Sequence, residues 1–445
     1  MSLSELKALA CQAIDSRRDG IVGLARAVLA NPETGFTEFK TSALVCQMLQ
    51  ELGVPHRKGI ALTGIKGYLQ GRQGPGPTVA IIGELDSLRV PDHPHANPET
   101  GAAHACGHHA QLGMLVGSAV GLLAPGVLDV LSGRVALVAV PAEEFIDVEY
   151  RYELHRQGRL GLMSGKQEFI RLGEFDNVDM AMLVHTNSRN GTKLALGGTS
   201  TAHLVKYVQF LGRAAHAGGA PWDGINALNA AGIALNAIHA VRETAREKDT
   251  IRLHFTITRG GVAVNSVPSD VRLEGRVRGR TLEAVAEANQ RVDRCLRAGA
   301  LAVGGGVRIA TIAGYLPQIN NSALLEAFRR NSVALVGQES VATRPERLAA
   351  GGSTDMGDLS HLMPAIHPYV SGATGRGHGN DYLIEDYDLA VITPAKIMAM
   401  TAIDLLSEGA ALATEIKNRH KPFMTKEQYL SLQASRTREE LYEGR

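Results

Sequence analysis

Apolar residues recur at helical spacing through the first fifty positions of the chain. They are three or four residues apart over 6–14 and again over 21–29, which places them on one face of a helix. A third helical pattern covers about 38–52 and ends at Gly53. Beyond Gly53, short apolar runs alternate with helical stretches. That alternation is typical of an α/β protein built on a mostly parallel sheet.

Four of the apolar runs lead directly to side chains that can bind a metal ion or transfer a proton. The C-terminal ends of parallel strands meet at one edge of a sheet, and ligands bind at that edge. A single Glu or His after a strand is often a solvated loop residue, but four such cases favour a shared site. The runs, each with the groups that follow it, are 79–82 with Glu84 and Asp86, 135–140 with Glu143 and Glu144, 180–184 with His185, and 364–370 with His378.

A period-two pattern begins at about residue 199. Its segments alternate apolar and polar positions, as half-exposed antiparallel strands do. We therefore expect an α+β module, an antiparallel sheet with two helices, inserted at 199–315 into an α/β domain formed by 1–198 and 316–445. The polar stretch 419–445 is expected to form a surface helix. The strands expected in the module are 203–212, 250–258, 270–278 and 307–314, and the helices are 224–243 and 281–299.

Composition restricts the classes of function. Lys and Arg number 46 against 45 Asp and Glu, a net charge of +1, and aromatic residues make up only 4%, so we expect no nucleic-acid partner. Four cysteines without a C-x-x-C pair argue against a disulfide framework. The N-terminal stretch lacks the apolar segment of a signal peptide, and the longest apolar candidate, 116–131, is broken by Pro125 and Asp129. These features predict a cytoplasmic protein that does not associate with membranes.

The sequence HACGHH at 104–109 is the most specific motif. Cys106 and His108 are two residues apart in a loop before a helix, so both can reach one metal ion or a pair of ions. Thiolate and imidazole are good ligands for zinc, and imidazole with carboxylate also suits other divalent ions. A lone Cys-x-His is more often a buried cysteine beside a chance histidine. Here three histidines surround one cysteine, and carboxylates follow the neighbouring strands.

Glu143 and Glu144 are adjacent at the end of a predicted strand. Successive strand residues point in opposite directions, but at a strand end both can face the crevice. One carboxylate can then bind metal while the other acts as a general base. A metal lowers the pKa of bound water to about 7, and the free carboxylate passes the proton to the leaving amine. A solvated acidic pair is the simpler alternative for these two residues alone.

These residues resemble the aminoacylase/carboxypeptidase-type dinuclear metallopeptidases, in the amidohydrolase branch. That branch includes auxin-conjugate hydrolases, hippurate hydrolases and aminobenzoyl-glutamate hydrolases. The resemblance covers nearly the whole chain. The motifs occur in the expected order as NPETGFTEFKTS (31–42), GELDSL (83–88), HACGH (104–108), PAEE (141–144), GRAAHAGGAPWDGINAL (212–228) and NSVPSDVRLEGRVR (265–278).

The resemblance implies two divalent metal ions per subunit, with zinc or manganese the first candidates and cobalt also plausible. The inserted module would be the dimerisation and substrate-lid domain of a homodimer, and the substrate a small N-acyl amino acid or dipeptide. Each implied role can be stated by residue. The metal ligands would be Cys106, His108, Glu144, His185 and His378, with Cys106 bridging the ions. Glu143 would be the general base, Asp86 would orient a ligand histidine, and His216 would stabilise the oxyanion across the dimer interface. Asn265 and Arg278 would bind the substrate, with Arg276 and Arg280 as equal candidates for the role of Arg278.

Two departures from the branch matter. The branch usually has Asp after HACGH, where this chain has His109, which adds a weak ligand or alters the surroundings of the ligands. The long charged segment 145–179 looks like the aminobenzoyl-glutamate hydrolases, whereas 351–369 looks like a dipeptidase subgroup that splits β-alanyl and related dipeptides. We expect hydrolysis of an aryl-acyl or aminoacyl amino acid, such as an aminobenzoyl-glutamate-like conjugate, with a β-alanyl-type dipeptidase as the alternative.

Two other kinds of protein also have to be considered. A cysteine hydrolase would use Cys106 with His104 or His108, but the Glu pair and His185 would then have no role. A non-catalytic metal-binding homologue would keep the fold, but the presumed base Glu143 is present here. A zinc deaminase does not fit, because the P-C-x-x-C element is absent.

Overall fold

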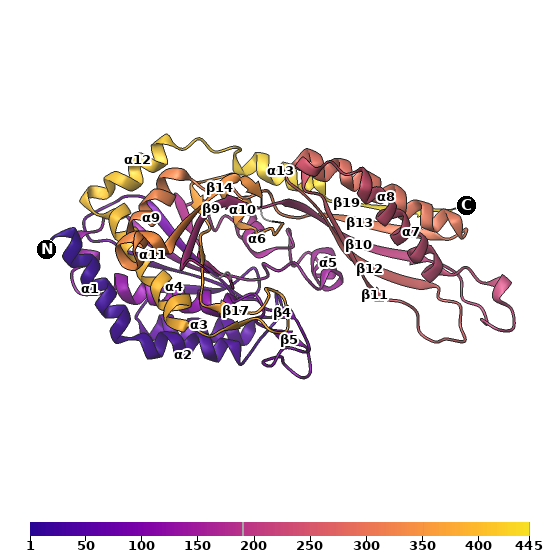
Figure 1. Ribbon diagram of the computed structural model, residues 1–445, viewed down its shortest axis with the longest axis horizontal. Coiled ribbons are helices and arrows are strands. Elements are labelled where there is room, and N and C mark those ends of the chain that lie inside the picture. The colour runs from indigo at the N-terminus through magenta and orange to yellow at the C-terminus, as the bar shows by residue number, and fades with distance from the viewer. Residues whose placement is uncertain (189–190, 350, 445) are drawn as a thin grey trace.

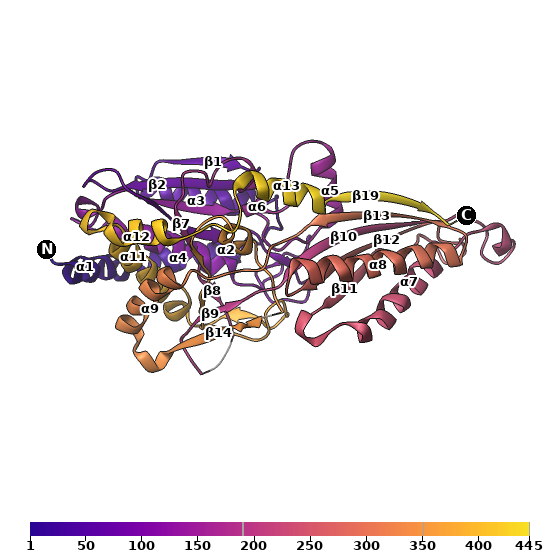
Figure 2. The same ribbon diagram turned by 90° about the horizontal axis from the view of Figure 1, so that it is seen from above.

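Two large sheets organise the molecule, one in each half of its length (Figures 1 and 2). The computed structural model describes residues 1–188, 191–349 and 351–444. The first sheet has six strands in the order β1-β2-β6-β3-β7-β15, and the second has five in the order β11-β12-β10-β13-β19. A mixed α/β fold with an antiparallel α+β part confirms the fold class expected from the sequence.

The six-stranded sheet is parallel at its centre. β3 pairs in parallel with β6 on one side and with β7 on the other, and β2 adds to β6 in the antiparallel sense. Every residue of β3 is buried, which explains its continuous apolar run: a strand covered on both faces has no polar side. The strands are β1 (His56–Ile60), β2 (Gly64–Gln70), β3 (Thr78–Glu84), β6 (Arg134–Val140), β7 (Met180–Met182) and β15 (Ala365–Ile366).

Helices cover both faces of this sheet. The largest apolar cluster joins one face to helices of the N-terminal third and to α11, and a second cluster lies on the other face. α4 (His108–Leu122) is buried along its whole length. A Cβ on its Gly117 would lie 2.8 Å from the Cβ of Ala395, so glycine permits the close approach of α11. The remaining helices of this half are α1 (Leu3–Ser16), α2 (Arg18–Leu29), α3 (Phe39–Glu51), α6 (Gly165–Arg171), α9 (Ser322–Val336), α10 (Met356–Ser360), α11 (Thr393–Leu406) and α12 (Ala411–Arg419).

One helical stretch is long and apolar enough, by length and composition, to cross a membrane. It runs from Asp388 to Leu406, and 78% of its most apolar window is buried inside the protein. Lys396 and Asp404 interrupt this apolar run, so the sequence pattern does not predict a membrane span there. A core helix has the same composition, and the burial here is that of a core helix.

The five-stranded sheet carries α7 and α8 on one face, as expected from the two helical patterns of the inserted module (Figure 1). On its other face, residues from β10 and β13 pack against Phe145 and Val148 at the start of α5. The elements of this half are α5 (Val148–Arg156), β10 (Ala202–Leu211), α7 (Ala227–Val241), β11 (Arg252–Arg259), β12 (Asp270–Gly279), α8 (Leu282–Ala302), β13 (Gly306–Ala313), α13 (Lys426–Arg436) and β19 (Arg438–Glu443).

The C-terminal segment differs from the surface helix expected over 419–445. α13 is shorter than expected, and the chain then continues as β19, which pairs antiparallel with β13 and runs along it in both views (Figures 1 and 2). The polar pattern of β19 hid this strand, because an edge strand exposes most of its side chains to water. The domain boundaries at 198/199 and 315/316 stay a proposal. β19 is an exception to this division, because it lies after residue 316 in the sequence but joins the sheet of the inserted module.

A smaller sheet and two short hairpins complete the fold around the expected site. The small sheet has the order β14-β9-β16-β8. Its strands and those of the hairpins are β8 (His185–Thr186), β9 (Leu194–Thr199), β14 (Val341–Ala349), β16 (Tyr369–Val370), β4 (Leu88–Arg89), β5 (Ala102–Ala103), β17 (Ala373–Thr374) and β18 (Leu383–Ile384).

Candidate metal centre

The expected ligands come together beyond the C-terminal ends of β3 and β6. Among the residues that the structure describes, potential metal ligands form three sets of three, with the ligand atoms of each set within 4.8 Å of one another. All five ligands expected from the sequence occur in these sets, and Cys106 belongs to two of them. The sets are Cys106 with His108 and His185, Cys106 with Glu144 and His378, and Glu84 with His108 and Glu143.

Gly107 makes the turn that lets Cys106 and His108 face one point. Its φ is +90°, in the left-handed region that disfavours residues with a Cβ. A Cβ at this position would also lie 2.1 Å from Oγ1 of Thr186. Cys106 precedes this turn and His108 begins α4, so a single glycine sets the relative position of the two ligands.

Strained backbone around Glu143 and Glu144 turns both carboxylates toward the cluster. Ala142 and Phe145, on either side of the pair, have φ values of +57° and +48°. These values are unusual for residues other than glycine and end the regular alternation of β6. Both glutamates are buried. The turn explains how two consecutive residues reach the same site.

The ligand atoms lie close together, and only some of their contacts are hydrogen bonds. Sγ of Cys106 is 3.3 Å from Nε2 of His185. Oε1 of Glu144 is 3.5 Å from Nε2 of His378 and 3.9 Å from Nε2 of His108. Among the described residues, neither Oε1 of Glu144 nor Nε2 of His108 has a hydrogen-bond partner, although both are buried and Nε2 of His108 lies 3.0 Å from Oε2 of Glu84. Such converging lone-pair donors, a thiol, imidazoles and carboxylates, fit divalent transition-metal ions.

Asp86 holds two of the expected ligands. Nδ1 of His108 lies 2.9 Å from the Asp86 carbonyl oxygen and 3.2 Å from its Oδ1. Oδ2 of Asp86 accepts the backbone N–H of Glu144 at 2.9 Å. Nδ1 is therefore occupied, and Nε2 of His108 faces the cluster. This is the arrangement that orients metal-binding imidazoles in other proteins.

The two adjacent glutamates differ in their pKa. Burial raises the pKa of Glu143 well above its ordinary value, and the negative charges of Glu84 and Glu144 add to this effect. Burial also opposes ionisation of Glu144, but the positive charges of His378 and His108 outweigh it and lower that pKa. A pair of carboxyl groups whose pKa values are pushed apart can divide the roles of proton carrier and anionic ligand.

A buried ion network beside the cluster was not expected from the sequence. Nζ of Lys166, in α6, lies 2.6 Å from Oε1 of Glu84 and also bonds to Oδ1 of Asp355. Burial opposes ionisation of Glu84, but the charges of Lys166 and His108 outweigh it and lower its pKa. Lys166 lies in a segment rich in charged residues, and such a pattern predicts solvent exposure. The position of Glu84 at a strand end is therefore the one sequence signal that could have indicated the network.

The five-stranded sheet reaches the cluster through the end of β12. Arg276 donates a hydrogen bond to the carbonyl oxygen of Glu144, and the Tyr315 hydroxyl donates one to the carbonyl oxygen of Glu143. Arg278 donates to Oγ of Ser353 at 2.8 Å. Burial, reinforced by the charge of Arg276, lowers the pKa of Arg278 to about 10. Arg278 is thus a desolvated cation near the two glutamates.

His216 and Asn265 lie together, but apart from the contacts of the cluster. The N–H of Ala217 donates to the Asn265 carbonyl oxygen at 2.9 Å, and His216 forms a β-bridge with Ser266. Both side chains are exposed. Within the described residues, no hydrogen bond or ion pair connects either of them to a ligand of the cluster.

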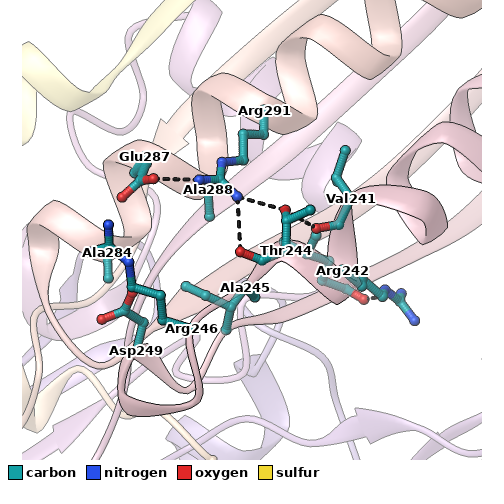
Figure 3. A pocket seen from close by; sticks show the side chains of 12 residues that line it. Val241, Arg242, Thr244, Ala245, Arg246, Asp249, Ala284, Glu287, Ala288 and Arg291 are labelled. Carbon is teal, nitrogen blue, oxygen red and sulfur yellow. Dashed lines mark hydrogen bonds and ion pairs between the residues drawn. The ribbon is translucent and has the colours of Figure 1, made fainter.

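A separate hollow lies in the other half of the molecule, between the end of α7, β11 and α8 (Figure 3). Its polar groups bond mainly to one another. Arg291 donates to Oγ1 of Thr244 at 2.7 Å and pairs with Glu287 at 2.5 Å, and Arg242 donates to the Leu253 carbonyl oxygen. This hollow has no metal-ligand set, so the chemistry of the described chain points to the cluster at Cys106.

Known proteins match both halves of the chain. The family model for the M20 peptidase dimerisation domain matches residues 190–303. The Xaa-Arg dipeptidase of Mus musculus is 28% identical over 451 residues, covering 97% of this chain and 96% of that protein. These matches support an M20 family of peptidases and amidohydrolases for this chain. The resemblance seen in the sequence is confirmed, and with it the class of enzyme, a hydrolase of amide bonds.

Solved structures share the fold of this chain. The YXEP protein of Bacillus subtilis, described as a dinuclear metal-binding peptidase of the M20 family, has a TM-score of 0.61 at 19% identity and covers 89% of this chain and 99% of its own. The aminobenzoyl-glutamate utilization protein of Klebsiella pneumoniae has a TM-score of 0.65 at 19% identity, with 88% and 97% covered. At this identity the likeness establishes the fold.

Proposed function

We propose that this M20 enzyme uses two divalent metal ions to hydrolyse the amide bond of an N-acyl amino acid or dipeptide. The observation that carries the proposal is the pair of ligand sets that share Cys106, placed beside the buried carboxyl group of Glu143. A shared thiolate supports a bridging position for Cys106. His108 and His185 would complete one ion's ligands, and Glu144 and His378 the other's.

The ligand atoms suit either zinc or manganese. The thiolate favours zinc, while the carboxylate and imidazoles also suit manganese. When bound, such ions polarise the amide carbonyl and lower the pKa of water. The chain's own residues supply the remaining chemistry.

Glu143 would act as the general base. Burial and the charges of Glu84 and Glu144 raise its pKa, which makes the carboxylate a stronger proton acceptor. It would take a proton from the attacking water and return it to the nitrogen of the leaving amine. The hydrogen bond from Tyr315 to the Glu143 carbonyl oxygen fixes the backbone of the base. Asp86 would act as a positioning residue, through His108 and the backbone of Glu144.

Arg278 would bind the carboxylate of the substrate. Burial lowers its pKa, and it donates a hydrogen bond to a neutral hydroxyl group, that of Ser353. A planar guanidinium can donate two hydrogen bonds to a carboxylate. Arg276 is the weaker of the other candidates, because it already bonds to the Glu144 carbonyl oxygen.

His216 and Asn265 would complete the site of the other subunit in a homodimer. Their exposure in one chain is consistent with that role. β11 is an edge strand, and apolar side chains near it are exposed: Ile257 at 41%, Val262 at 88% and Val264 at 101%. An edge strand with apolar exposed neighbours suits pairing with a second copy. Light scattering during size exclusion would show twice the chain mass, and a monomer at micromolar concentration would refute this arrangement.

A dipeptide is now the favoured substrate class. The Xaa-Arg dipeptidase matches nearly the full length of this chain, and the dipeptidase-like segment 351–369 contributes Ser353 and Asp355 close to the site. An aryl-acyl amino acid, such as an aminobenzoyl-glutamate-like conjugate, is the second candidate, supported by segment 145–179 and by the shared fold of the Klebsiella protein.

The two alternative kinds of protein fit the geometry less well. Burial and the charge of Glu144 raise the pKa of Cys106 well above its ordinary value, whereas a nucleophilic cysteine needs a lowered one. A non-catalytic homologue would not need the separated pKa values of Glu143 and Glu144. A cysteine hydrolase would survive chelation and be lost on alkylation.

A panel of amides tests the proposal. It would contain dipeptides with C-terminal Arg, a β-alanyl dipeptide, aminobenzoyl-glutamate, indoleacetyl-aspartate, hippurate and an N-acetyl amino acid. Purified, metal-loaded dimer is expected to release the amine product from at least one dipeptide and to act more slowly on the aryl conjugates. Faster hydrolysis of aminobenzoyl-glutamate would reverse the substrate order, and no hydrolysis of any member would contradict the proposal.

A further inference from the structure

A second group of histidines lies beside the cluster and takes no part in it. His95, His104 and His109 line one pocket of about 390 Å³, together with Tyr382 and Tyr387. The ring centroids of His104 and His109 are 5.2 Å apart, and that of His109 is 6.3 Å from the ring of Tyr387. None of the three histidines belongs to the ligand sets at Cys106.

The helix geometry separates His109 from the cluster. Consecutive residues of an α-helix point about 100° apart, so His108 and His109 at the start of α4 cannot face the same point. His108 faces Glu84 and Glu144, and His109 faces His104 and Tyr387. The unusual histidine after HACGH thus enters the second group and does not join the first.

His104 and His109 are buried without hydrogen-bond partners. Each is 1% exposed, and none of their four ring nitrogens has a partner among the described residues. The neighbouring His93 differs, because its Nε2 lies 2.8 Å from the Tyr382 carbonyl oxygen and its Nδ1 accepts the N–H of His95 at 3.1 Å. Buried polar side chains normally have partners. His93 is therefore held by the protein itself, whereas His104 and His109 offer free lone pairs to a ligand.

We propose that His104, His109 and His95 form a further metal site, separate from the cluster at Cys106. Its ligands are all imidazoles, which favour late first-row divalent ions such as Zn²⁺, Co²⁺ or Ni²⁺ over Mg²⁺ and Ca²⁺, since the latter prefer oxygen. His104 and His109 are the fixed donors. His95 is exposed and lines the same pocket. The described residues whose ligand atoms already lie within 4.8 Å of one another do not include this trio, so the His95 side chain would have to turn toward His104 and His109 to supply the third donor. An ion here would tie the loop at His104 to the first turn of α4.

Cobalt titration of the metal-free, full-length protein tests this site. Thiolate coordination at Cys106 gives a sulfur-to-cobalt charge-transfer band in the near ultraviolet, whereas an all-imidazole site gives only visible d–d bands. Wild type is expected to bind one Co²⁺ more, by equilibrium dialysis, than a His104→Gln/His109→Asn double variant. The double variant is expected to retain the charge-transfer band, which shows that the cluster is intact.

A variant at the exposed position, His95, controls for misfolding of the double variant. His95→Ala alters no buried group and is expected to weaken the additional Co²⁺ at least tenfold, with the charge-transfer band unchanged. His239→Ala, at an exposed histidine of α7, is the matched control and is expected to bind like wild type. Cys106→Ser is expected to lose the band but to keep the additional ion. Equal cobalt binding by wild type and the double variant, or by wild type and His95→Ala, would overturn the proposal.

Discussion

The carboxylate of Asp86 lies 3.2 Å from Nδ1 of His108, and the Asp86 carbonyl oxygen lies 2.9 Å from the same nitrogen. Two oxygens of one residue therefore fix the orientation of this imidazole. The other carboxylate oxygen of Asp86 accepts the backbone N–H of Glu144. One side chain at the end of β3 thus positions groups from two other segments of the site.

Replacing Asp86 is expected to weaken metal binding. In Asp86→Ala, His108 would lose its orienting carboxylate and Glu144 its backbone acceptor, so the affinity for metal should fall about 10- to 100-fold. Competition with a chromophoric chelator measures this affinity. Asp92→Ala, at an exposed position of the following loop, is the control and should bind as wild type does. An unchanged affinity in Asp86→Ala would show that the contact is not needed for binding.

Replacing Arg278 is expected to reduce affinity for substrates that carry a carboxylate. Loss of hydrogen bonds to a charged group costs about 1.5–3 kcal/mol, so KM for a dipeptide should rise about 10- to 100-fold in Arg278→Ala. For the same dipeptide with an amidated C-terminus, wild type and variant should differ little. Arg280→Ala separates the alternatives, because it should leave both values unchanged. A larger effect in Arg280→Ala would move the carboxylate site to that residue.

Removing the charge of Lys166 is expected to destabilise the fold. Lys166→Met would leave Glu84 and Asp355 buried without their cation, which costs about 3–5 kcal/mol. Urea denaturation followed by circular dichroism gives the free energy of unfolding. Lys417→Met, which breaks an ion pair with Asp179 where the lysine is 54% exposed, is the control and should lose no more than about 1 kcal/mol. Equal losses in the free energy of unfolding would mean that the buried network contributes no more to stability than the exposed ion pair does.

The stability of the protein is expected to depend on the ionisation of Asp358. Burial, with the charge of Asp355, raises its pKa to about 7, although the hydrogen bond from Tyr429 opposes the shift. The folded state therefore keeps a proton between about pH 4 and 7 that the unfolded state has lost. Its contribution to stability falls as pH rises through this window, by about 1.4 kcal/mol per unit of pKa difference.

Asp358→Asn removes this ionisation. Relative to wild type, the variant should become more stable as the pH is raised from 4.5 to 7.5, when both are measured by urea denaturation at each pH. A constant difference between the two proteins across that range would show that Asp358 ionises in the folded state as it does in the unfolded state.

Much of the site could be predicted because its ligands follow sequence patterns that the fold preserves. Strand ends bring Glu144 and His185 to one edge, and the loop before α4 brings Cys106 and His108. Lys166 could not be predicted, because a buried lysine has the same sequence pattern as a solvated one. Its burial depends on Glu84 and Asp355, which are 82 and 189 residues away.

The C-terminal strand was missed for a related reason. β19 is polar, and a strand that pairs by one edge needs no apolar alternation. The roles expected of His216 and Asn265, which lie in exposed loops, are harder to test. Among the described residues, no hydrogen bond joins either of them to the metal-ligand cluster of the same chain. Roles that depend on a second subunit cannot be seen in the contacts of one chain.

Chelation with metal add-back, carried out beside Glu143→Ala, tests the central claim most directly. With the best dipeptide of the panel, wild type should lose its activity after chelation and recover it when zinc or manganese is returned. Glu143→Ala should bind the same amount of metal at the Cys106 cluster, yet turn over about 10²- to 10⁴-fold more slowly. Activity that survives chelation, or a Glu143→Ala variant as fast as wild type, would contradict a metal-dependent hydrolase that uses Glu143 as its base.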